Sequence, residues 1–256
     1  MTTPETGLQQ PRVSIVVPAH QEGEAIVAFL DRLFESVTLG CEVFVVYDSA
    51  DDDTAPYLAK HAATEPRLTP LLNTYGAGPA NAIRFGIDQA SAGVVVVTMA
   101  DGSDDPRQID ELTRLVERGV VVAAASRYMP GGQQVGGPAL KGLLSRLAGL
   151  SLHWLARVGT RDATNSFKAY DVAFVRDVGI DSRTGFEIGL ELTAKAKRRR
   201  LPVAEIPTIW LDRTAGVSNF KVAAWIPRYL QWYRFAFGPA LGAAELRART
   251  SGSGAP

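Results

Sequence analysis

Acidic side chains stand at the ends of two apolar runs of this sequence, and a guanidinium stands at the end of a third. Asp48, Asp101 and Arg127 each follow a run rich in β-branched or small apolar residues. In an open α/β sheet, side chains at the carboxyl ends of strands lie at the usual ligand-binding edge. Carboxylates with few histidines suit a hard cation such as Mg²⁺ or Mn²⁺, which can neutralise a diphosphate leaving group. These residues therefore predict a metal-assisted reaction on a phosphorylated ligand.

Acidic residues are also common at helix starts, where they cap backbone N–H groups. Capping is the favoured interpretation for Asp51 and Asp105, whereas the strand-end positions of Asp48 and Asp101 favour a role in binding. The glycine-rich stretch 76–86 opens a helix but lacks the full spacing of a dinucleotide or phosphate loop. It fits either a phosphate cradle or a simple helix-starting turn.

The elements that would position these side chains alternate along the first half of the chain. Continuous apolar runs are typical of strands covered on both faces of a parallel sheet. They predict strands at 13–17, 42–47, 94–99 and 120–125, with helices between and after them at 22–37, 52–64, 78–92 and 106–118. This alternation predicts an α/β fold with a doubly wound, mostly parallel central sheet flanked by helices.

The second half continues without a polar linker, so we expect it to complete the same domain and form the acceptor side. Its patterns predict a helix at 139–158, a strand near 163–170, a helix near 186–198, a strand at 203–211 and an aromatic helix at 223–237. The expected organisation is a flexible N-terminus (1–11), a catalytic domain (12–222), an amphipathic aromatic helix within 223–244 and a disordered tail (245–256).

Composition limits the classes of partner and compartment. The 27 Lys and Arg residues balance 27 Asp and Glu residues, so no global charge favours nucleic acid as a partner. The single cysteine, Cys41, cannot form a disulfide framework or a thiolate metal site. The polar N-terminus predicts no secretory signal, and no run of about 18 apolar residues predicts a transmembrane helix. We therefore expect a cytoplasmic protein.

Two segments favour attachment to a membrane surface. The helices expected at 139–158 and 223–237 combine Leu, Trp and Tyr with internal or flanking Arg. Such helices are typical of the membrane interface, here the cytoplasmic face. Core packing or a dimer contact is the alternative.

Taken together, the motifs resemble the family 2 inverting glycosyltransferases, which have the GT-A (nucleotide-diphospho-sugar transferase) fold. The likeness is greatest to the polyprenyl-phosphate sugar transferases of the dolichyl-phosphate mannosyltransferase type. It runs from about 12 to 222 and is carried by IVVPAHQEGEAI, YDSADDDT, MADGSDDP, SRYMPGG, DATNSFKAY, GFEIGLEL and EIPTIWLDRTAGVSNFK. The chain departs from the family pattern at Tyr47, Met99, Ser103 and Asn219, and Met99 replaces the first acid of the metal motif.

The resemblance implies a role for each matching position. The metal would be held by Asp101, Ser103 and Asp104, with donor phosphates completing the site. The implied donor-binding residues are Pro18, Ala19, Glu22, Asp48, Gly76, Gly78, Asp101 and Gly102. The implied acceptor or phosphate-binding residues are Arg127, Lys141, Arg146, Ser218 and Lys221, and the implied catalytic residues are Asp101, Arg127 and Arg213.

The resulting hypothesis is a metal-dependent inverting transferase that moves a hexose from GDP-mannose or a UDP-hexose to a polyprenyl (dolichyl or undecaprenyl) phosphate. A lipid phosphate is already anionic, so it needs cations rather than the general base that a sugar hydroxyl needs. The predicted loops supply cations, and no motif surrounds His20, His61 or His153. Two alternatives stay open: a hydroxyl acceptor, or a nucleotide-sugar-binding protein with weak catalysis.

Overall fold

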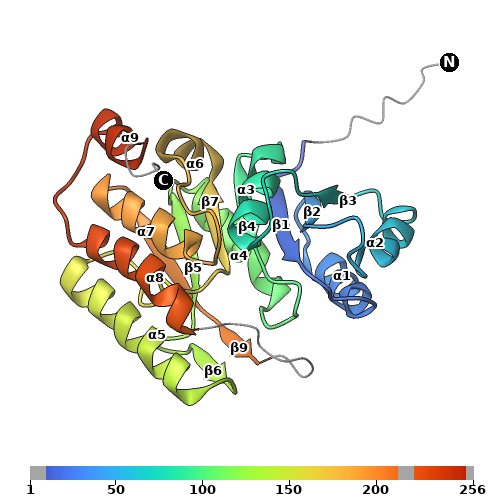
Figure 1. The fold of residues 1–256 in the computed structure, drawn as a ribbon, viewed down its shortest axis with the longest axis horizontal. Coiled ribbons are helices and arrows are strands. Elements are labelled where there is room, and N and C mark those ends of the chain that lie inside the picture. The colour runs from blue at the N-terminus through green and yellow to red at the C-terminus, as the bar shows by residue number, and fades with distance from the viewer. Residues whose placement is uncertain (1–9, 213–221, 252–256) are drawn as a thin grey trace.

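The computed structural model describes residues 10–212 and 222–251 (Figure 1). Most of the predicted flexible N-terminus lies outside these ranges, as do Arg213, Ser218 and Lys221. No helix within them is both long and apolar enough to cross a bilayer.

Seven strands form the central sheet in the order β3-β2-β1-β4-β7-β5-β8. Their bounds are Val13–Ala19 (β1), Cys41–Tyr47 (β2), Leu68–Leu72 (β3), Val94–Val97 (β4), Val122–Ser126 (β5), Lys168–Asp171 (β7) and Val203–Pro207 (β8). All neighbours pair in parallel except β7, which runs antiparallel to both β4 and β5. The predicted mostly parallel α/β sheet is thus confirmed.

Helices cover both faces of this sheet. One face carries α1 (Ala25–Ser36), α2 (Ala55–Ala62) and α4 (Ile109–Glu117), the last preceded by the 3₁₀ turn η1 (Pro106–Gln108). The other face carries α3 (Pro79–Gln89), α6 (Val172–Val178) and α7 (Ile188–Arg198). Each helix turns an apolar stripe toward the sheet, which explains why the strands read as continuous apolar runs.

A smaller layer flanks the C-terminal half of the sheet. Strands β6 (Gln133–Val135) and β9 (Ile209–Leu211) pair in parallel, and α5 (Ala139–Ser151) continues into the π-helical turn η2 (Leu152–Ala156). Helix α8 (Val222–Ala236) packs on α7 and η2 and buries Trp232 there. The Ser151 hydroxyl lies 2.9 Å from the Tyr233 hydroxyl, so the end of α5 is held beside α8 (Figure 1).

The structure differs from the sequence-based expectation in four elements that had not been predicted: β3, β6, α6 and α9. Strand β3 is a half-exposed edge strand that contains Pro70, so its apolar pattern is weak. The strand expected at 203–211 is two strands, β8 and β9, which separate at Thr208 and join different sheets.

Part of the segment expected to be a disordered tail, residues 245–251, is described as helical. Helix α9 (Ala243–Ser251) occupies that segment, and its Leu246 is buried in the core of the second sheet face. Arg247 also donates a hydrogen bond of 2.8 Å from Nε to the Asp177 carbonyl. The Gly- and Ser-rich composition of the tail gave no indication of the buried leucine or of this hydrogen bond. Residues 252–256 lie outside the described chain.

Candidate active site

Three predicted site residues lie at one edge of the sheet, because β1, β2 and β4 run in parallel and β5, related to β4 through antiparallel β7, runs in the same direction. Asp48 follows β2, Asp101 follows β4 and Arg127 follows β5. Strand β7 begins at this same edge, since Lys168 is opposite Val97 and Ala124. The loop before β7 is thereby added to the site, a placement that only the antiparallel pairing creates.

The loop after β1 is shaped by acids that follow β2. Pro18 and Ala19 end β1 and are buried. The Asp52 carboxylate accepts hydrogen bonds from the Gln21 N–H at 3.1 and 3.2 Å, and the Thr54 hydroxyl accepts one from the Glu22 N–H at 2.9 Å. Sequence reasoning did not identify this bracing role, which holds the predicted donor-binding turn in place.

Asp48 shapes the glycine-rich segment. Its two carboxylate oxygens accept hydrogen bonds from Asn73 Nδ2 at 2.8 Å and from the Gly78 N–H at 2.7 Å. Gly76 and Gly78 have φ of +95° and +113°, and a Cβ on Gly78 would lie 2.9 Å from the Thr184 carbonyl oxygen. Because Asp48 already takes the Gly78 N–H, the geometry favours a shaped helix-starting turn over a phosphate cradle there.

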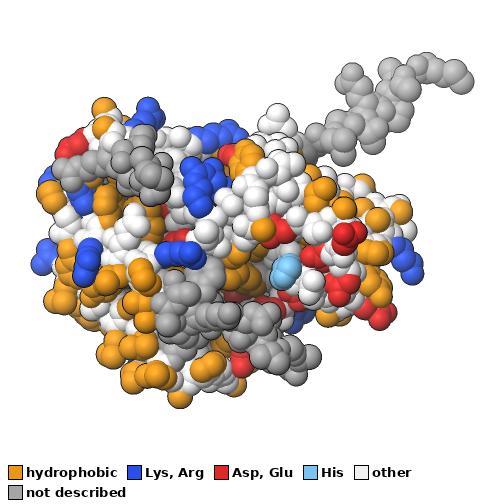
Figure 2. Space-filling view, viewed as in Figure 1, with side chains coloured by type: hydrophobic (Ala, Val, Ile, Leu, Met, Phe, Trp, Pro, Cys, Tyr) orange, Lys and Arg blue, Asp and Glu red, His pale blue; other side chains and the backbone are white. Residues whose placement is uncertain are grey.

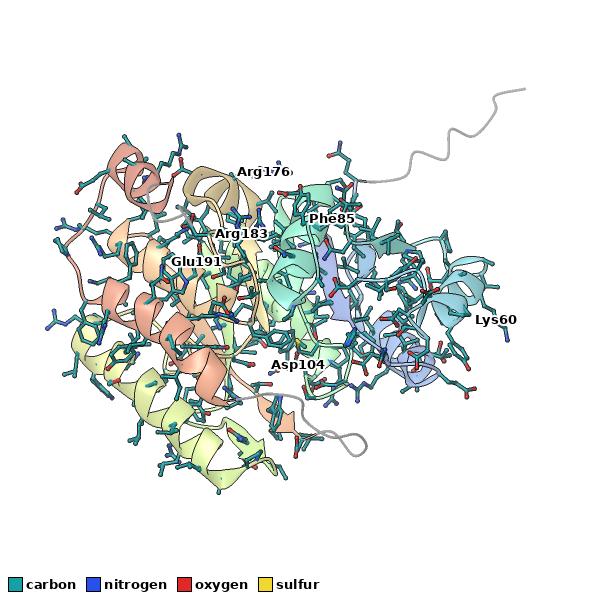
Figure 3. The ribbon with its side chains drawn as sticks, viewed as in Figure 1. Lys60, Phe85, Asp104, Arg176, Arg183 and Glu191 are labelled. Carbon is teal, nitrogen blue, oxygen red and sulfur yellow. The ribbon has the colours of Figure 1, made fainter. Side chains whose placement is uncertain are left out.

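The two acids after β4 point in different directions. Asp101 is half-buried, and its Oδ1 accepts a hydrogen bond from the Ser103 N–H at 3.1 Å. Asp104 is buried, and its Oδ2 accepts from the Thr98 hydroxyl and the Met99 N–H, both at 3.1 Å. Burial raises the pKa of Asp104 to about 7, with a smaller contribution in the same direction from the Asp101 charge. Asp104, labelled in Figure 3, therefore braces the turn that presents Asp101, and its expected role as a metal ligand stays a prediction that these contacts do not support.

The outer side of this turn is fixed by α1. Arg32 Nη2 donates a hydrogen bond of 2.8 Å to the Gly102 carbonyl. Gly102 has φ of +71°, and a Cβ on it would lie 3.1 Å from Arg32 Nη2. The left-handed backbone therefore favours glycine at this turn, and a side chain there would displace the Arg32 guanidinium.

The donor set fits a hard divalent cation whose shell is completed by a ligand. Among the described residues, no group of three or more acids, histidines or cysteines is placed to hold a metal ion. Ser103 Oγ is buried and has no hydrogen-bond partner within that part of the chain. An Asp101 carboxylate and a Ser103 hydroxyl suit Mg²⁺ or Mn²⁺, which commonly take one or two protein oxygens plus phosphate oxygens and water.

Arg127 is held rigidly by Asp162, which sequence reasoning did not single out. Arg127 Nε and Nη2 donate to the two Asp162 oxygens at 2.7 and 2.9 Å, and the Arg127 N–H donates to Asp162 at 3.0 Å. The guanidinium also lies over the rings of Tyr128 and Trp210, 5.0 and 6.0 Å from their centroids. Burial alone lowers the pKa of Arg127, but the charge and hydrogen bonds of Asp162 raise it more, so the arginine is always charged.

A buried lysine binds the loop that contains Asp162, just before β7. Lys168 Nζ donates to the Ala163 carbonyl at 3.2 Å and to the Asn165 carbonyl. Burial lowers the pKa of Lys168 to about 7, although Asp162 acts in the opposite direction. The lysine thus fixes the loop that carries Asp162, and through it the position of Arg127.

The two glutamates of GFEIGLEL have different surroundings in the structure. Glu187 is buried, and its Oε2 accepts no hydrogen bond from the described residues. Burial raises its pKa. Glu191, by contrast, is tied to Lys195 at 2.6 Å and to the Asp181 N–H at 2.7 Å. Burial raises the pKa of Tyr229, and the Glu187 charge acts in the same direction.

Three other residues considered from the sequence lie on α5 and at the start of η1. Arg146 is exposed on α5, and its charge acts on Tyr128. Lys141 lies in the first turn of α5, but its side chain is not described. Asp105 caps η1 by accepting the Arg107 N–H at 3.1 Å, which confirms the capping interpretation.

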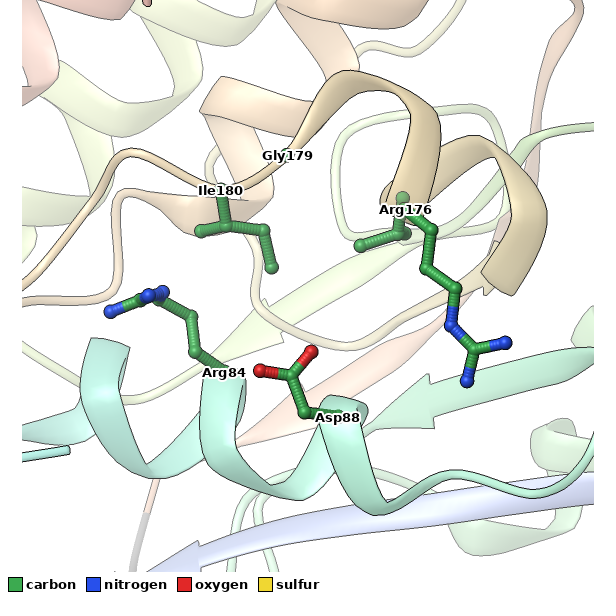
Figure 4. A pocket seen from close by; sticks show the side chains of 6 residues that line it. Arg84, Asp88, Arg176, Gly179 and Ile180 are labelled. Carbon is green, nitrogen blue, oxygen red and sulfur yellow. The ribbon is translucent and has the colours of Figure 1, made fainter. Parts of the chain in front are cut away.

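A separate hollow lies between α3 and the end of α6, away from the carboxyl ends of the strands (Figure 4). Arg84, Asp88, Arg176 and Ile180 line it together with Val175 and Gly179. None of these residues is a predicted site residue, so this hollow is not the candidate active site.

Comparison with known sequences identifies the chain's relatives. Residues 14–178 match the model of glycosyl transferase family 2. The polyprenol monophosphomannose synthase of Mycolicibacterium smegmatis is 28% identical over 239 residues, covering 87% of this chain and 89% of that protein. The undecaprenyl-phosphate mannosyltransferase of Micrococcus luteus is 27% identical over 216 residues, covering 82% and 88%. The dolichol-phosphate mannosyltransferase of Pyrococcus furiosus is 26% identical, and the match covers 82% of this chain and 59% of that protein.

Solved structures support the fold. A mannosyltransferase from Pyrobaculum calidifontis, in complex with GDP-Man and Mn²⁺, superposes with a TM-score of 0.59 at 18% identity, covering 94% of this chain and 69% of that one. Glucosyl-3-phosphoglycerate synthase from Mycobacterium tuberculosis, with Mn²⁺ and UDP, superposes with a TM-score of 0.68 at 14% identity, covering 93% and 87%. The expected GT-A fold is thereby confirmed.

Proposed function

The chain belongs to glycosyl transferase family 2, and we propose that it transfers a hexose with inversion from GDP-mannose or a UDP-hexose to a polyprenyl phosphate, with Mg²⁺ or Mn²⁺ as cofactor. The relatives' names support a polyprenyl phosphate as the acceptor class. One observation carries the proposal: Asp101 and the rigidly held Arg127 follow strands that end at the same sheet edge.

On the donor side, the residues around Asp48 and Asp101 have separate tasks. Asp48 fixes the Gly76–Gly78 turn against which a nucleoside would lie. Asp101 and Ser103 would hold the cation, which when bound neutralises charge on the diphosphate leaving group. Asp104 stays turned toward β4 and keeps Asp101 presented to the ligand.

On the acceptor side, Arg127 would bring a second anion close to the donor. Two anionic phosphates repel each other strongly in a site shielded from water. The guanidinium is fixed by Asp162, so it can stabilise the approaching phosphate without first being ordered. A phosphate nucleophile of this kind needs no proton removed by the protein.

The proposed membrane side is the outer surface of α5 and α8. Figure 2 shows hydrophobic side chains gathered along the lower left of the molecule, over α5 and β6. The exposed apolar residues there include Leu140, Leu143, Leu144, Leu147, Trp154, Leu155, Ile226, Leu230 and Phe237. A contiguous apolar surface of this kind marks a membrane or protein contact. We place the lipid acceptor, and peripheral attachment at the cytoplasmic face, on this side.

The direct test is a transfer assay with labelled GDP-mannose or UDP-glucose, Mn²⁺, and either a short polyprenyl phosphate or simple sugars. We expect label in the organic phase only with the polyprenyl phosphate. The Asp101→Asn variant should lower turnover at least about 100-fold with an unchanged fold, as expected when an essential electrostatic group is lost. Asp105→Asn is the matched control, because that acid caps η1 and pairs with Arg107. Equal turnover in the two variants would refute the role of Asp101.

A hydroxyl acceptor is the second candidate, and Glu187 is the observation in its favour. A buried carboxyl group with a raised pKa and an unpartnered oxygen among the described residues could remove a proton from a sugar hydroxyl. In that case sugars would accept the label, and Glu187→Gln would abolish transfer to them. With a phosphate acceptor, the same variant should change turnover far less.

A further inference from the structure

The end of helix α5 has an unusual backbone and lies beside a pocket. Its last turn widens into the π-helical segment η2 (Leu152–Ala156), and Arg157 then adopts a left-handed conformation with φ of +58°. Both features are uncommon, and π-helical turns are frequent at functional sites. The pocket has a volume of about 410 Å³ and is lined by His153, Trp154, Arg157 and Gly159.

The chemistry of this pocket suits an anion. No acid lines it, and Arg157 is exposed at its rim. His153 lines the pocket with its ring, but its Nδ1 is buried away from solvent, so Arg157 is the group that could meet an anion there. The His153 ring meets the Trp154 ring edge to face, with centroids 5.0 Å apart. The Arg161 guanidinium lies 6.0 Å from the centre of the Trp154 ring, but Arg161 forms an ion pair with Glu205. Arg157, at the rim of the pocket, forms no ion pair with the described acids.

The pocket also continues an apolar stripe. Leu140, Leu143, Leu147, Trp154 and Leu155 follow helical spacing along one side of α5 and η2, and all are exposed. Trp154 belongs to both the stripe and the pocket. A ligand seated in the pocket would therefore meet a cation at one end and an apolar surface at the other, as the phosphate head and acyl chain of a lipid require.

We propose that this pocket binds the phosphate head group of an anionic membrane lipid. The site is distinct from Asp101 and Arg127 and holds no part of the reaction. This proposal rests on the proposed attachment of the α5 surface to a membrane. A lipid head group bound at the C-terminal end of α5 would fix the orientation of that surface on the membrane.

The test is calorimetric titration of the full chain with dihexanoyl phosphatidylglycerol below its micelle concentration. Dihexanoyl phosphatidylcholine and inorganic phosphate serve as comparison ligands. We expect saturable binding of the anionic lipid alone. Arg157→Asn, which removes the charge but tolerates a left-handed backbone, should weaken this binding about fivefold, the usual effect of one basic residue at an anionic lipid surface.

Arg200→Asn is the matched control, because Arg200 is likewise exposed with φ of +56° but lies outside the pocket. Equal weakening by Arg157→Asn and Arg200→Asn would overturn the proposal in favour of general surface charge. Inorganic phosphate binding as tightly as the lipid would overturn the lipid assignment, and no saturable binding would overturn the site. Hexose transfer is measured separately on each variant. A variant that loses lipid binding but transfers hexose normally to a short-chain acceptor would leave the proposed function intact. Absence of transfer in the wild type would count against the proposed function, but the lipid-binding measurement would still test the pocket.

Discussion

The buried pair between Arg127 and Asp162 gives a prediction that separates stability from catalysis. Asp162→Asn keeps the side-chain shape but removes the charge that faces a guanidinium only 12% exposed. Removing one partner of a buried ion pair typically costs about 3–5 kcal/mol, because the other charge stays buried without compensation. For a chain of this size that corresponds to a Tm lowered by about 10 °C.

The assay is urea unfolding of the wild type, Asp162→Asn and a double variant, Arg127→Met with Asp162→Leu. Replacing both partners by apolar residues of similar size is often nearly neutral, so the double variant should recover most of the lost free energy of unfolding. It should nevertheless stay inactive, because the guanidinium proposed to bind phosphate is gone. A free energy of unfolding for Asp162→Asn within about 1 kcal/mol of the wild type would refute the reasoning, since this is the range of an exposed pair. Normal turnover in the double variant would refute the catalytic role of Arg127.

Three further predictions follow from single contacts. Gly78→Ala should lower the free energy of unfolding by about 2 kcal/mol and raise the KM for the donor, because Gly78 has φ of +113° and a Cβ there would meet the Thr184 carbonyl. Gly93→Ala is the control and should change neither quantity, because the space around Gly93 is open. The raised pKa of Asp104 means that its carboxyl group holds its proton more tightly in the folded state, so the free energy of unfolding of the wild type should fall by up to about 4 kcal/mol as pH rises from about 4 through 7. Urea unfolding between pH 4.5 and 6.5 should show that the free energy of unfolding of Asp104→Asn changes less with pH than that of the wild type. The same change with pH in both proteins would contradict the raised pKa. Leu147→Gln should reduce vesicle flotation without lowering Tm, since the side chain is exposed on α5, and unchanged flotation would remove α5 from the membrane contact.

Several features of the fold were accessible from sequence because they depend on local patterns. The runs around Val13, Val43, Val94 and Val122 are continuous and β-branched, as strands buried on both faces must be. Edge strand β3 escaped detection because Pro70 and partial exposure break that pattern. Helix α9 escaped because one buried leucine in a polar stretch gives too weak a periodic signal.

The arrangement of the candidate site could be predicted from sequence only in part. Asp48, Asp101 and Arg127 could be singled out because each ends a strand, and such residues meet at the carboxyl edge of a parallel sheet. The sequence could not show that Asp48 binds the Gly78 N–H, nor that Asp104 turns back toward Thr98. Neighbouring acids in one motif have the same chemistry, and only the surrounding backbone decides which of them faces a ligand.

The sequence by itself therefore determined the alternation of strands and helices, the family, and the sheet edge at which the candidate site residues lie. Tertiary structure alone decided that β7 enters between β4 and β5 in the opposite direction. That pairing brings Asp162 to Arg127, and Lys168 beneath both, across 35 and 41 residues of sequence from Arg127 to each. Long-range pairs of this kind leave no periodic trace in a sequence, because the two partners are distant along the chain and meet only when the fold buries them together.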